Sequence, residues 1–195
     1  VENIENYKIL GFKRIQMKIV RSEKSSSLGL KASSVGHFVR LYKDLILYLK
    51  QEISNNHFEA IKMIMNRNDM LGKIIISLLM REPCITRCMA GRDKISVTAG
   101  GDIYPCESFI GIEQFCIGNV YKNMDIENTF TKINVYFQDK CSNCWAKYIC
   151  GGGCYYRNYI ETGHIDRPSE AYCRFYKKLI EMAIDLVAFI SRDDM

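Results

Sequence analysis

Apolar residues recur at three- and four-residue steps through much of residues 35–79, a spacing typical of amphipathic helices. The pattern predicts three helices, the first with Ser33 or Ser34 as its N-cap and the last ending before Pro83. The apolar positions that define them are Val35, Phe38, Val39, Tyr42, Leu45, Ile46 and Leu49, then Phe58, Ile61, Ile64 and Met65, then Leu71, Ile74, Ile75, Leu78 and Leu79. Ahead of these helices, apolar and polar residues alternate over residues 12–19, which predicts a strand.

From Cys84 onward the elements become short and glycines frequent. Residues 95–98 and 103–104 flank an Ala-Gly-Gly-Asp turn, which predicts a β-hairpin, and residues 117–120 predict another short strand. Over residues 141–154 neither periodicity dominates, and three consecutive glycines permit a close approach of the backbone to a ligand. A final apolar stripe over residues 175–190 predicts a long helix capped by Ser169.

Composition is that of a globular protein, with 195 residues of which 48% are hydrophobic. No apolar run approaches the roughly 20 residues that cross a bilayer, so no membrane association is expected. The first residues lack the features of a signal peptide, which predicts the reducing cytoplasm as the location. The net charge of +5 is spread along the chain without a basic arm, so nucleic acid is not an expected partner.

Nine cysteines change this picture, because seven of them form one ordered pattern. In order these are Cys88, Cys106, Cys141, Cys144, Cys150, Cys154 and Cys173, with Gly101 opening a Gly-Asp-Ile-Tyr-Pro-Cys stretch. Closely spaced thiols without a sign of secretion favour metal over disulfides, and the odd count argues against a disulfide-stapled secreted domain. Thiolate ligands narrow the metal to iron–sulfur clusters or zinc. The pair Cys141 and Cys144, two residues apart, is common to both kinds of site.

The full array resembles the SPASM region that follows the barrel of radical S-adenosylmethionine (radical SAM) enzymes. Every position of that motif is present, and the match spans residues 84–173. The resemblance implies two auxiliary 4Fe–4S clusters whose ligands interleave along the chain. The first would use Cys84, Cys88, Cys106 and Cys154, and the second would use Cys141, Cys144, Cys150 and Cys173. Cys84 lies outside the seven-cysteine motif, and related enzymes can leave one iron open for a substrate.

The N-terminal part resembles the last strand and helices of the partial (β/α) barrel of the same family. The Cys-x3-Cys-x2-Cys motif that holds the catalytic cluster in that family is absent, since Cys84 and Cys88 are followed by Gly91 at the third position. About eighty residues are also too few for a barrel of roughly 200. We therefore expect the C-terminal piece of a larger enzyme, inactive alone, with S-adenosylmethionine bound only by the full-length protein. No catalytic residue is assigned, and whether the chain is itself an enzyme is left open.

The expected fold class is α+β. Residues 1–81 would form the end of the barrel with its connecting helices. Residues 82–195 would form a small cysteine-rich domain of short β-hairpins, closed by the long C-terminal helix.

Within the family, the nearest likeness is to enzymes that modify ribosomally made peptides, for example by thioether crosslinks. Next come the anaerobic enzymes that oxidise a Cys or Ser of sulfatases to formylglycine. By analogy the auxiliary clusters would accept an electron from a substrate radical, dock a peptide or protein substrate, or do both, and we take electron transfer as the hypothesis. The alternative is a zinc-binding interaction module, because short hairpins with paired cysteines also suit structural zinc.

Other residues receive smaller roles. Cys116 is expected to be a small buried apolar residue, and Asp102 and Glu107 are expected to serve turns and surface. The lone Trp145 and three tyrosines are expected to pack over a cluster and exclude solvent. The tyrosines are Tyr155, Tyr156 and Tyr159. Nearby cations would offset the negative charge of a cluster, although an ordinary surface role is favoured for each one. They are Arg87, Arg92, Lys94, Lys140, Lys147, Arg157 and Arg174. His37, His57 and His164 share no metal-binding spacing.

Overall fold

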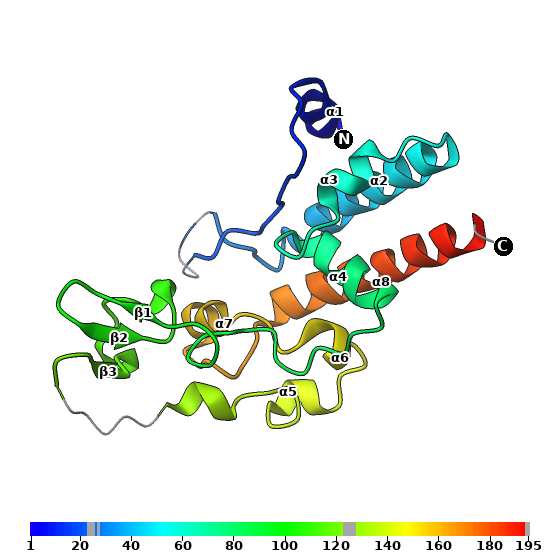
Figure 1. Cartoon of the computed structure of the whole chain (residues 1–195). Helices are drawn as coiled ribbons and strands as arrows, with labels where there is room; N and C mark the ends of the chain where they lie inside the picture. The colour runs from blue at the N-terminus through cyan, green and yellow to red at the C-terminus, as the bar shows by residue number, and fades with distance from the viewer. Residues whose placement is uncertain (23–25, 27, 123–127, 194–195) are drawn as a thin grey trace. The chain divides into compact units, whose positions relative to one another are not determined.

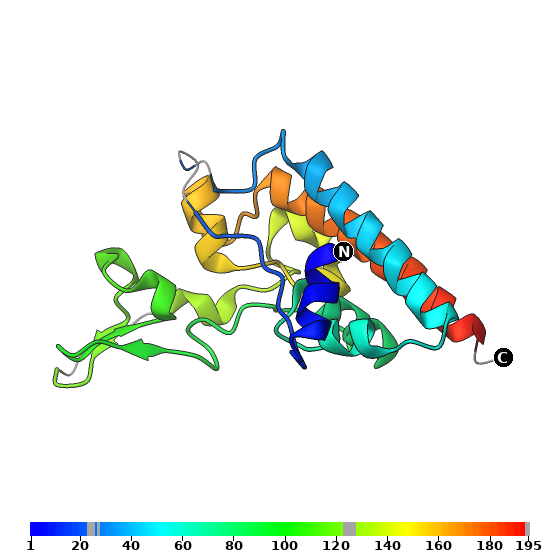
Figure 2. The same ribbon diagram turned by 90° about the horizontal axis from the view of Figure 1, so that it is seen from above.

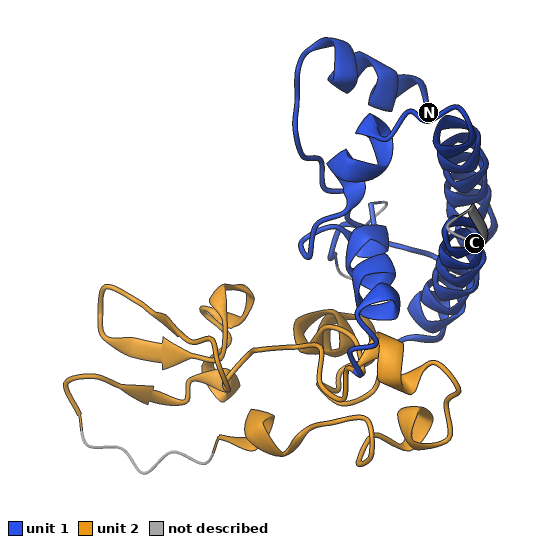
Figure 3. Ribbon diagram, turned by 45° about the vertical axis from the view of Figure 1, so that its right-hand side comes forward, with its two compact units in different colours: residues 1–83, 169–195 blue, residues 84–168 orange. Residues whose placement is uncertain are grey.

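The computed structural model describes residues 1–22, 26, 28–122 and 128–193. They divide into two compact units (Figure 3), of which unit 1 is Val1–Pro83 with Ser169–Met195 and unit 2 is Cys84–Pro168. Unit 2 is therefore an insertion between two parts of unit 1. The architecture mixes helices with one small three-stranded sheet, which confirms the α+β class in outline. Over the described residues, no helix has both the length and the apolarity required to cross a membrane.

Unit 1 is helical. It contains α1 (Glu2–Ile9), α2 (Val35–Ser54), α3 (Glu59–Ile64), α4 (Met70–Leu79) and α8 (Glu170–Asp193). The long helices α2 and α8 lie side by side (Figures 1 and 2), and α4 packs against α8. Their apolar stripes form the core, with Leu49, Leu179 and Leu186 fully buried. The four helices predicted from periodicity are thus confirmed, whereas α1 was not predicted.

The predicted strand over residues 12–19 is wrong. The backbone of this segment hydrogen-bonds to helix ends, with the Ile15 N–H donating to the Met63 carbonyl at 3.0 Å. The Met17 N–H donates to the Asp69 carboxylate at 2.6 Å. Among the described residues the segment therefore joins no sheet, although its alternating pattern is that of a strand.

Helix α4 begins at a buried N-cap, Asp69, which accepts hydrogen bonds from the N–H groups of Leu71 and Gly72 at 2.8 and 2.9 Å. Burial raises the pKa of Asp69, and these backbone donors oppose that rise only in part. The predicted cap Ser169 is confirmed, because its hydroxyl accepts from the Tyr172 N–H at 3.3 Å. Ser34 precedes α2, but its hydroxyl bonds to Lys31 rather than to the helix.

Unit 2 combines the small sheet with short helices. The strands β1 (Ser96–Val97), β2 (Asp102–Tyr104) and β3 (Gly118–Asn119) pair antiparallel in that order, which confirms the predicted hairpin and third strand. The helices are η1 (Glu107–Phe109), η2 (Glu113–Phe115), η3 (Thr129–Lys132), α5 (Asp139–Ser142), α6 (Lys147–Cys150) and α7 (Tyr155–Thr162). None of these six helices was predicted.

Unit 2 has an aromatic core built from η1, η2, η3 and α7. The ring of Phe109 lies 5.3 Å from that of Phe130 and 5.4 Å from that of Tyr156, and Phe115 lies 4.8 Å from Tyr159. The C-terminal helix α8, which was expected to close the cysteine-rich domain, packs against α2 and α4 in unit 1. The functional division at residue 81 stays a prediction.

Candidate metal centres

All nine cysteines lie among the described residues, and none of them is in a disulfide. Of the eight predicted ligands, seven lie in unit 2, and Cys173 lies on α8 in unit 1. Within the described ranges, no three His, Cys, Asp or Glu side chains are grouped closely enough to hold one metal ion. A single zinc ion gathers its sulfur ligands at about 2.3 Å, and a 4Fe–4S cubane spaces its ligands more widely. The two ligand sets remain predictions. We refer to Cys84, Cys88, Cys106 and Cys154 as the first quartet, and to Cys141, Cys144, Cys150 and Cys173 as the second quartet.

Cys88 and Cys154 of the first quartet meet directly. Cys154 is the N-cap residue of α7, and its thiol is hydrogen-bonded to that of Cys88. This contact, together with burial, raises the pKa of Cys88, and hydrogen bonds from the N–H groups of Tyr155 and Ala90 to its sulfur act in the opposite direction. Backbone N–H donors directed at a cysteine sulfur are a known means of tuning iron–sulfur clusters.

Cys84 and Cys106 reach the same neighbourhood from two other segments. The Cys84 N–H donates to the Tyr148 carbonyl at 2.6 Å, and its sulfur lies so close to Gly151 that a β-carbon there would be 2.4 Å away. Cys106 is buried in the aromatic core, and Cys88 packs against that core. The residue before Cys106 accepts a backbone hydrogen bond from Gly91 at 2.9 Å, which holds the two cysteine-bearing segments together.

Tyr155, the first residue of α7, connects these cysteines. Its hydroxyl donates to the Ile133 carbonyl at 2.9 Å. Burial raises the pKa of Tyr155, and negative charge on Cys88 and Cys84 raises it further, whereas Arg92 lowers it. The phenol is therefore within electrostatic reach of two members of the first quartet. The side chain was expected to shield a cluster from solvent, and its full burial beside Cys88 is consistent with that role.

The triple-glycine loop, residues 151–153, is clamped between Cys84 and α7. Its three φ angles are +66°, +81° and +80°, a left-handed region that favours glycine, so all three positions need this residue type. Arg87 holds the loop by three hydrogen bonds. Its N–H donates to the Gly151 carbonyl at 2.7 Å, and its guanidinium donates to the Cys150 carbonyl at 3.0 Å and to the Ile149 carbonyl.

Three cysteines of the second quartet lie on or between two short helices, with Cys141 on α5, Cys150 on α6 and Cys144 in the segment that joins them. The Cys141 N–H donates to the Gln138 carbonyl at 2.8 Å, and the Cys144 N–H donates to the Cys141 carbonyl at 2.9 Å. Cys150 is the last residue of α6. Cys173 lies near the start of α8, and its N–H donates to the Ser169 carbonyl at 3.0 Å. The neighbouring Trp145 is 54% exposed, which does not match the expectation that it covers a cluster.

Orphaned polar atoms gather beside these cysteines. Within the described chain, the side-chain amide of Gln138, the hydroxyl of Thr86 and the side-chain carbonyl of Asn158 are buried without a hydrogen-bond partner. Gln138 is only 2% exposed, and a β-carbon on Gly152 would lie 2.2 Å from its Oε1. Buried donors without acceptors cost free energy, and cluster sulfurs are acceptors. The donors among these groups, the Gln138 amide N–H and the Thr86 hydroxyl, therefore fit an iron–sulfur cluster.

Several of the neighbouring cations have partners within the protein. Lys94 pairs with Glu107 at 2.6 Å, and Arg157 pairs with Glu161 at 3.1 Å inside the unit. Arg92 donates to the Thr131 carbonyl at 2.8 Å. The expected surface role thus holds for Lys94 and Arg92, whereas Arg157 is buried and takes part in an internal ion pair instead.

Cys116 and Asp102 also take structural roles. Cys116 is partly buried against the aromatic core, and its thiol donates to the Gly118 carbonyl at 3.3 Å. The Asp102 carboxylate accepts from the Asn119 amide at 2.8 Å and so supports the pairing of β2 with β3.

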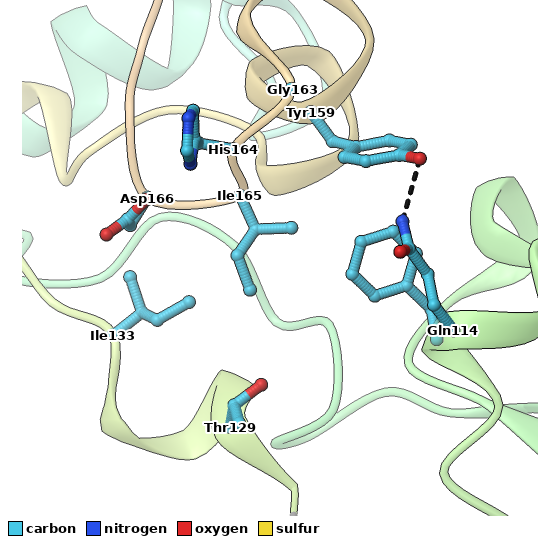
Figure 4. A pocket seen from close by; sticks show the side chains of 9 residues that line it. Gln114, Thr129, Ile133, Tyr159, Gly163, His164, Ile165 and Asp166 are labelled. Carbon is cyan, nitrogen blue, oxygen red and sulfur yellow. Dashed lines mark hydrogen bonds between the residues drawn. The ribbon is translucent and has the colours of Figure 1, made fainter.

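A cavity of about 420 Å³ opens in unit 2 (Figure 4). It is lined by Gln114, Phe115, Thr129, Ile133, Tyr159, Gly163, His164, Ile165 and Asp166. The Gln114 amide donates to the Tyr159 hydroxyl at 2.8 Å, which joins two walls of the cavity. Ile133, on another wall, is the residue whose carbonyl receives the Tyr155 hydroxyl. The cavity was not predicted, since no spacing in the sequence relates residues 114, 133 and 164.

Comparisons with known proteins agree with the fold. No family model matches the chain. A curated relative from Archaeoglobus fulgidus, an uncharacterized protein, is 35% identical over 127 residues, which are 62% of this chain and 30% of that protein. Solved structures of native anSMEcpe are 18% identical. The structure with bound AdoMet matches with a TM-score of 0.61 over 98% of this chain, and the structure with AdoMet and the Kp18Cys peptide matches with 0.58 over 97%.

The chain spans about half the length of the solved structures that it matches, 53% and 52% respectively. At this level of identity the likeness establishes the fold. This chain thus shares its fold with part of anSMEcpe over nearly its whole length.

Proposed function

We propose that this chain carries two auxiliary 4Fe–4S clusters that serve electron transfer and substrate docking in a radical SAM enzyme that modifies peptides or proteins. The first quartet would hold one cluster and the second quartet the other. When bound, such clusters accept or donate single electrons at potentials set by their surroundings. Activity would belong to a longer protein that also contains the Cys-x3-Cys-x2-Cys motif.

One observation carries the proposal. The Cys88 and Cys154 thiols, 66 positions apart in the sequence numbering, share a hydrogen bond beside Tyr155. Cys84 contacts the loop that leads to Cys154, and Cys106 lies in the core against which Cys88 packs. This interleaved order is the order that the SPASM resemblance implies. In a zinc knuckle, two cysteines separated by two residues, such as Cys141 and Cys144, would more simply bind one ion together with the ligands nearest to them in the sequence.

The comparisons support the reaction class. The structures that match this chain contain AdoMet, and two of them also contain a peptide, Kp18Cys or Cp18Cys. These are properties of anSMEcpe, and we extend them to the longer protein to which this chain would belong. The S-adenosylmethionine would bind to that protein outside the present residues.

The cavity of unit 2 is our candidate for the docking of a substrate side chain. Its wall at Ile133 is joined by a hydrogen bond to Tyr155, which lies beside two cysteines of the first quartet. The rings of Phe115 and Tyr159 offer apolar contact, and Asp166 and His164 offer polar contact.

Anaerobic reconstitution with iron and sulfide tests the clusters. The expected product is brown, absorbs in the near-visible range and contains about eight irons per chain. Cys88→Ala and Cys144→Ala should each reduce the iron content and change the spectrum of a different cluster. Cys116→Ala is the matched control and should load normally, because Cys116 belongs to neither quartet. A colourless wild-type protein that binds zinc would instead support the zinc-binding module.

The electron-transfer role needs the longer enzyme. Cys144→Ala in that enzyme should abolish turnover with a peptide substrate while leaving peptide binding intact. Unchanged turnover in this variant would defeat the role, even if the clusters were present.

A further inference from the structure

Gln138 of unit 2 has a buried side-chain amide. It lies three residues before Cys141, and its main-chain carbonyl accepts hydrogen bonds from Cys141 and Ser142 at 2.8 and 2.9 Å. Its side chain turns to the triple-glycine loop and ends against Gly152. The residue before Gly152 is in contact with the Cys84 sulfur. The amide and this sulfur therefore contact neighbouring residues of one loop, whose Cα atoms are about 3.8 Å apart.

The amide of Gln138 has no partner for either of its polar atoms among the described residues. Leaving such a group buried and unpaired destabilises the fold, because the lost hydrogen bonds to water are not replaced. A core built only for packing would accommodate leucine or methionine at this position without that cost. The site instead combines a long amide with a left-handed glycine whose missing β-carbon leaves space for it. This combination indicates a ligand for the amide beside the loop.

We propose that the Gln138 side chain donates an N–H hydrogen bond to a sulfur of the cluster held by the first quartet. The main chain of the same residue orients Cys141 of the second quartet, so that Gln138 is a positioning residue shared by the two cluster sites. The inference rests on the proposed function. Thiolate and sulfide sulfurs are acceptors, so the amide nitrogen, and not its oxygen, forms the bond. A donor of this kind stabilises the more negative, reduced cluster and thereby raises its potential.

The test is a redox titration, monitored by electron paramagnetic resonance, of the anaerobically reconstituted protein. Gln138→Met removes the donor and nearly conserves volume, so the cluster should still load. The midpoint potential of the first cluster should fall by about 59 mV, which corresponds to a tenfold change in the ratio of oxidised to reduced protein for a one-electron couple. The signal that disappears in Cys88→Ala protein identifies this cluster.

The matched control is Gln51→Met, which removes an exposed glutamine of α2 in unit 1 and should leave both potentials at their wild-type values. Potentials in Gln138→Met that equal those of the wild type, at equal iron content, would overturn the inference and leave the proposed function intact. A wild-type protein that forms no cluster would overturn both. The two failures are therefore distinguishable.

If Gln138→Met loads less iron, the unaltered protein decides the question. The chain contains four glutamines, Gln16, Gln51, Gln114 and Gln138, which cell-free synthesis can label with ¹⁵N in the side-chain amide. Electron–nuclear double resonance of the reduced first cluster should then detect a ¹⁵N coupling that persists in Gln114→Met protein. The absence of any amide coupling in the labelled wild type would refute the hydrogen bond.

Discussion

A methyl group added at Gly152 would overlap sterically with the buried side-chain amide of Gln138. The new β-carbon would lie 2.2 Å from Oε1 and 3.1 Å from Cδ, on a residue whose φ angle is +81°. Gly152→Ala therefore introduces two separate costs. The left-handed backbone costs a residue with a β-carbon about 1–2 kcal/mol, and overpacking of a closed site costs about 1–3 kcal/mol. The expected loss in the free energy of unfolding of unit 2 is the sum, about 2–5 kcal/mol.

The chain offers a control that separates these costs. Gly163 ends α7 with a φ angle of +78°, and a β-carbon built there has nothing within 4 Å. Gly163→Ala thus carries the backbone cost of about 1–2 kcal/mol without the clash. The lower chain entropy of alanine in the unfolded state affects both variants alike. The difference between the two variants should be about 1–3 kcal/mol.

Fluorescence of Trp145 provides the assay, because it is the only tryptophan of the chain and lies in unit 2. Urea unfolding of the reduced, metal-free protein should place Gly152→Ala at a lower midpoint than Gly163→Ala. Adding Gln138→Ala to Gly152→Ala should recover part of the loss, since the clash then has no partner. Equal destabilisation by the two glycine variants, or additive effects in the double variant, would refute the close contact between Gln138 and Gly152.

Three further changes test other parts of the chain. Phe109→Ala leaves a cavity at the centre of the aromatic core and should lower the free energy of unfolding, monitored by Trp145 fluorescence, by about 3–5 kcal/mol. The control is Phe137→Ala, at a side chain that is 75% exposed, which should change stability by less than about 0.5 kcal/mol. Glu161→Gln removes the carboxylate that pairs with the buried Arg157 and should lower the free energy of unfolding by about 3–5 kcal/mol in the same assay. Replacing both partners, with Arg157→Met and Glu161→Leu, should cost less, and a larger loss in this double variant would contradict the argument. Burial raises the pKa of Asp69, so its contribution to stability is complete below the unfolded pKa of about 3.9 and is lost as the pH rises through the folded pKa. Asp69→Asn should remove this part of the pH dependence in thermal melts followed by circular dichroism. Parallel pH profiles for the two proteins would argue against this reasoning.

Elements with a strong apolar stripe or an explicit turn were predictable. Helices α2, α4 and α8 bury the positions that the three- and four-residue spacing selects, and Gly101 adopts the positive φ angle that the hairpin turn needs. Helix α7 was missed because its buried face includes Arg157, Asn158 and Glu161, which a sequence pattern assigns to solvent. Their burial depends on an internal ion pair and on hydrogen bonds that only the folded unit provides.

The failed strand over residues 12–19 has a related cause. Alternation identifies a segment with two different sides, but the partners of its backbone decide whether it becomes a strand. Here Asp69 and the end of α3 supply those partners.

The candidate ligands were accessible from sequence, whereas their surroundings were not. Cysteine spacing alone identifies seven positions as a set, and Cys84 joined them by its place next to that set. Gln138 and Tyr155 carry no comparable signal, because glutamine and tyrosine are ordinary residues in any spacing. Their significance depends on burial and on contacts with Gly152 and Cys88, which are properties of tertiary structure.

The insertion of unit 2 into unit 1 has a consequence for biosynthesis. A ribosome completes Cys84–Pro168 before it makes any residue of α8, so unit 2 can fold while α2 and α4 still lack the helix that they pack against. All four sulfurs of the first quartet emerge in that earlier stage, and Cys173 emerges only with α8. If both quartets hold clusters as proposed, maturation would be ordered in time, with the first quartet complete on the nascent chain before α8 supplies the fourth sulfur of the second quartet.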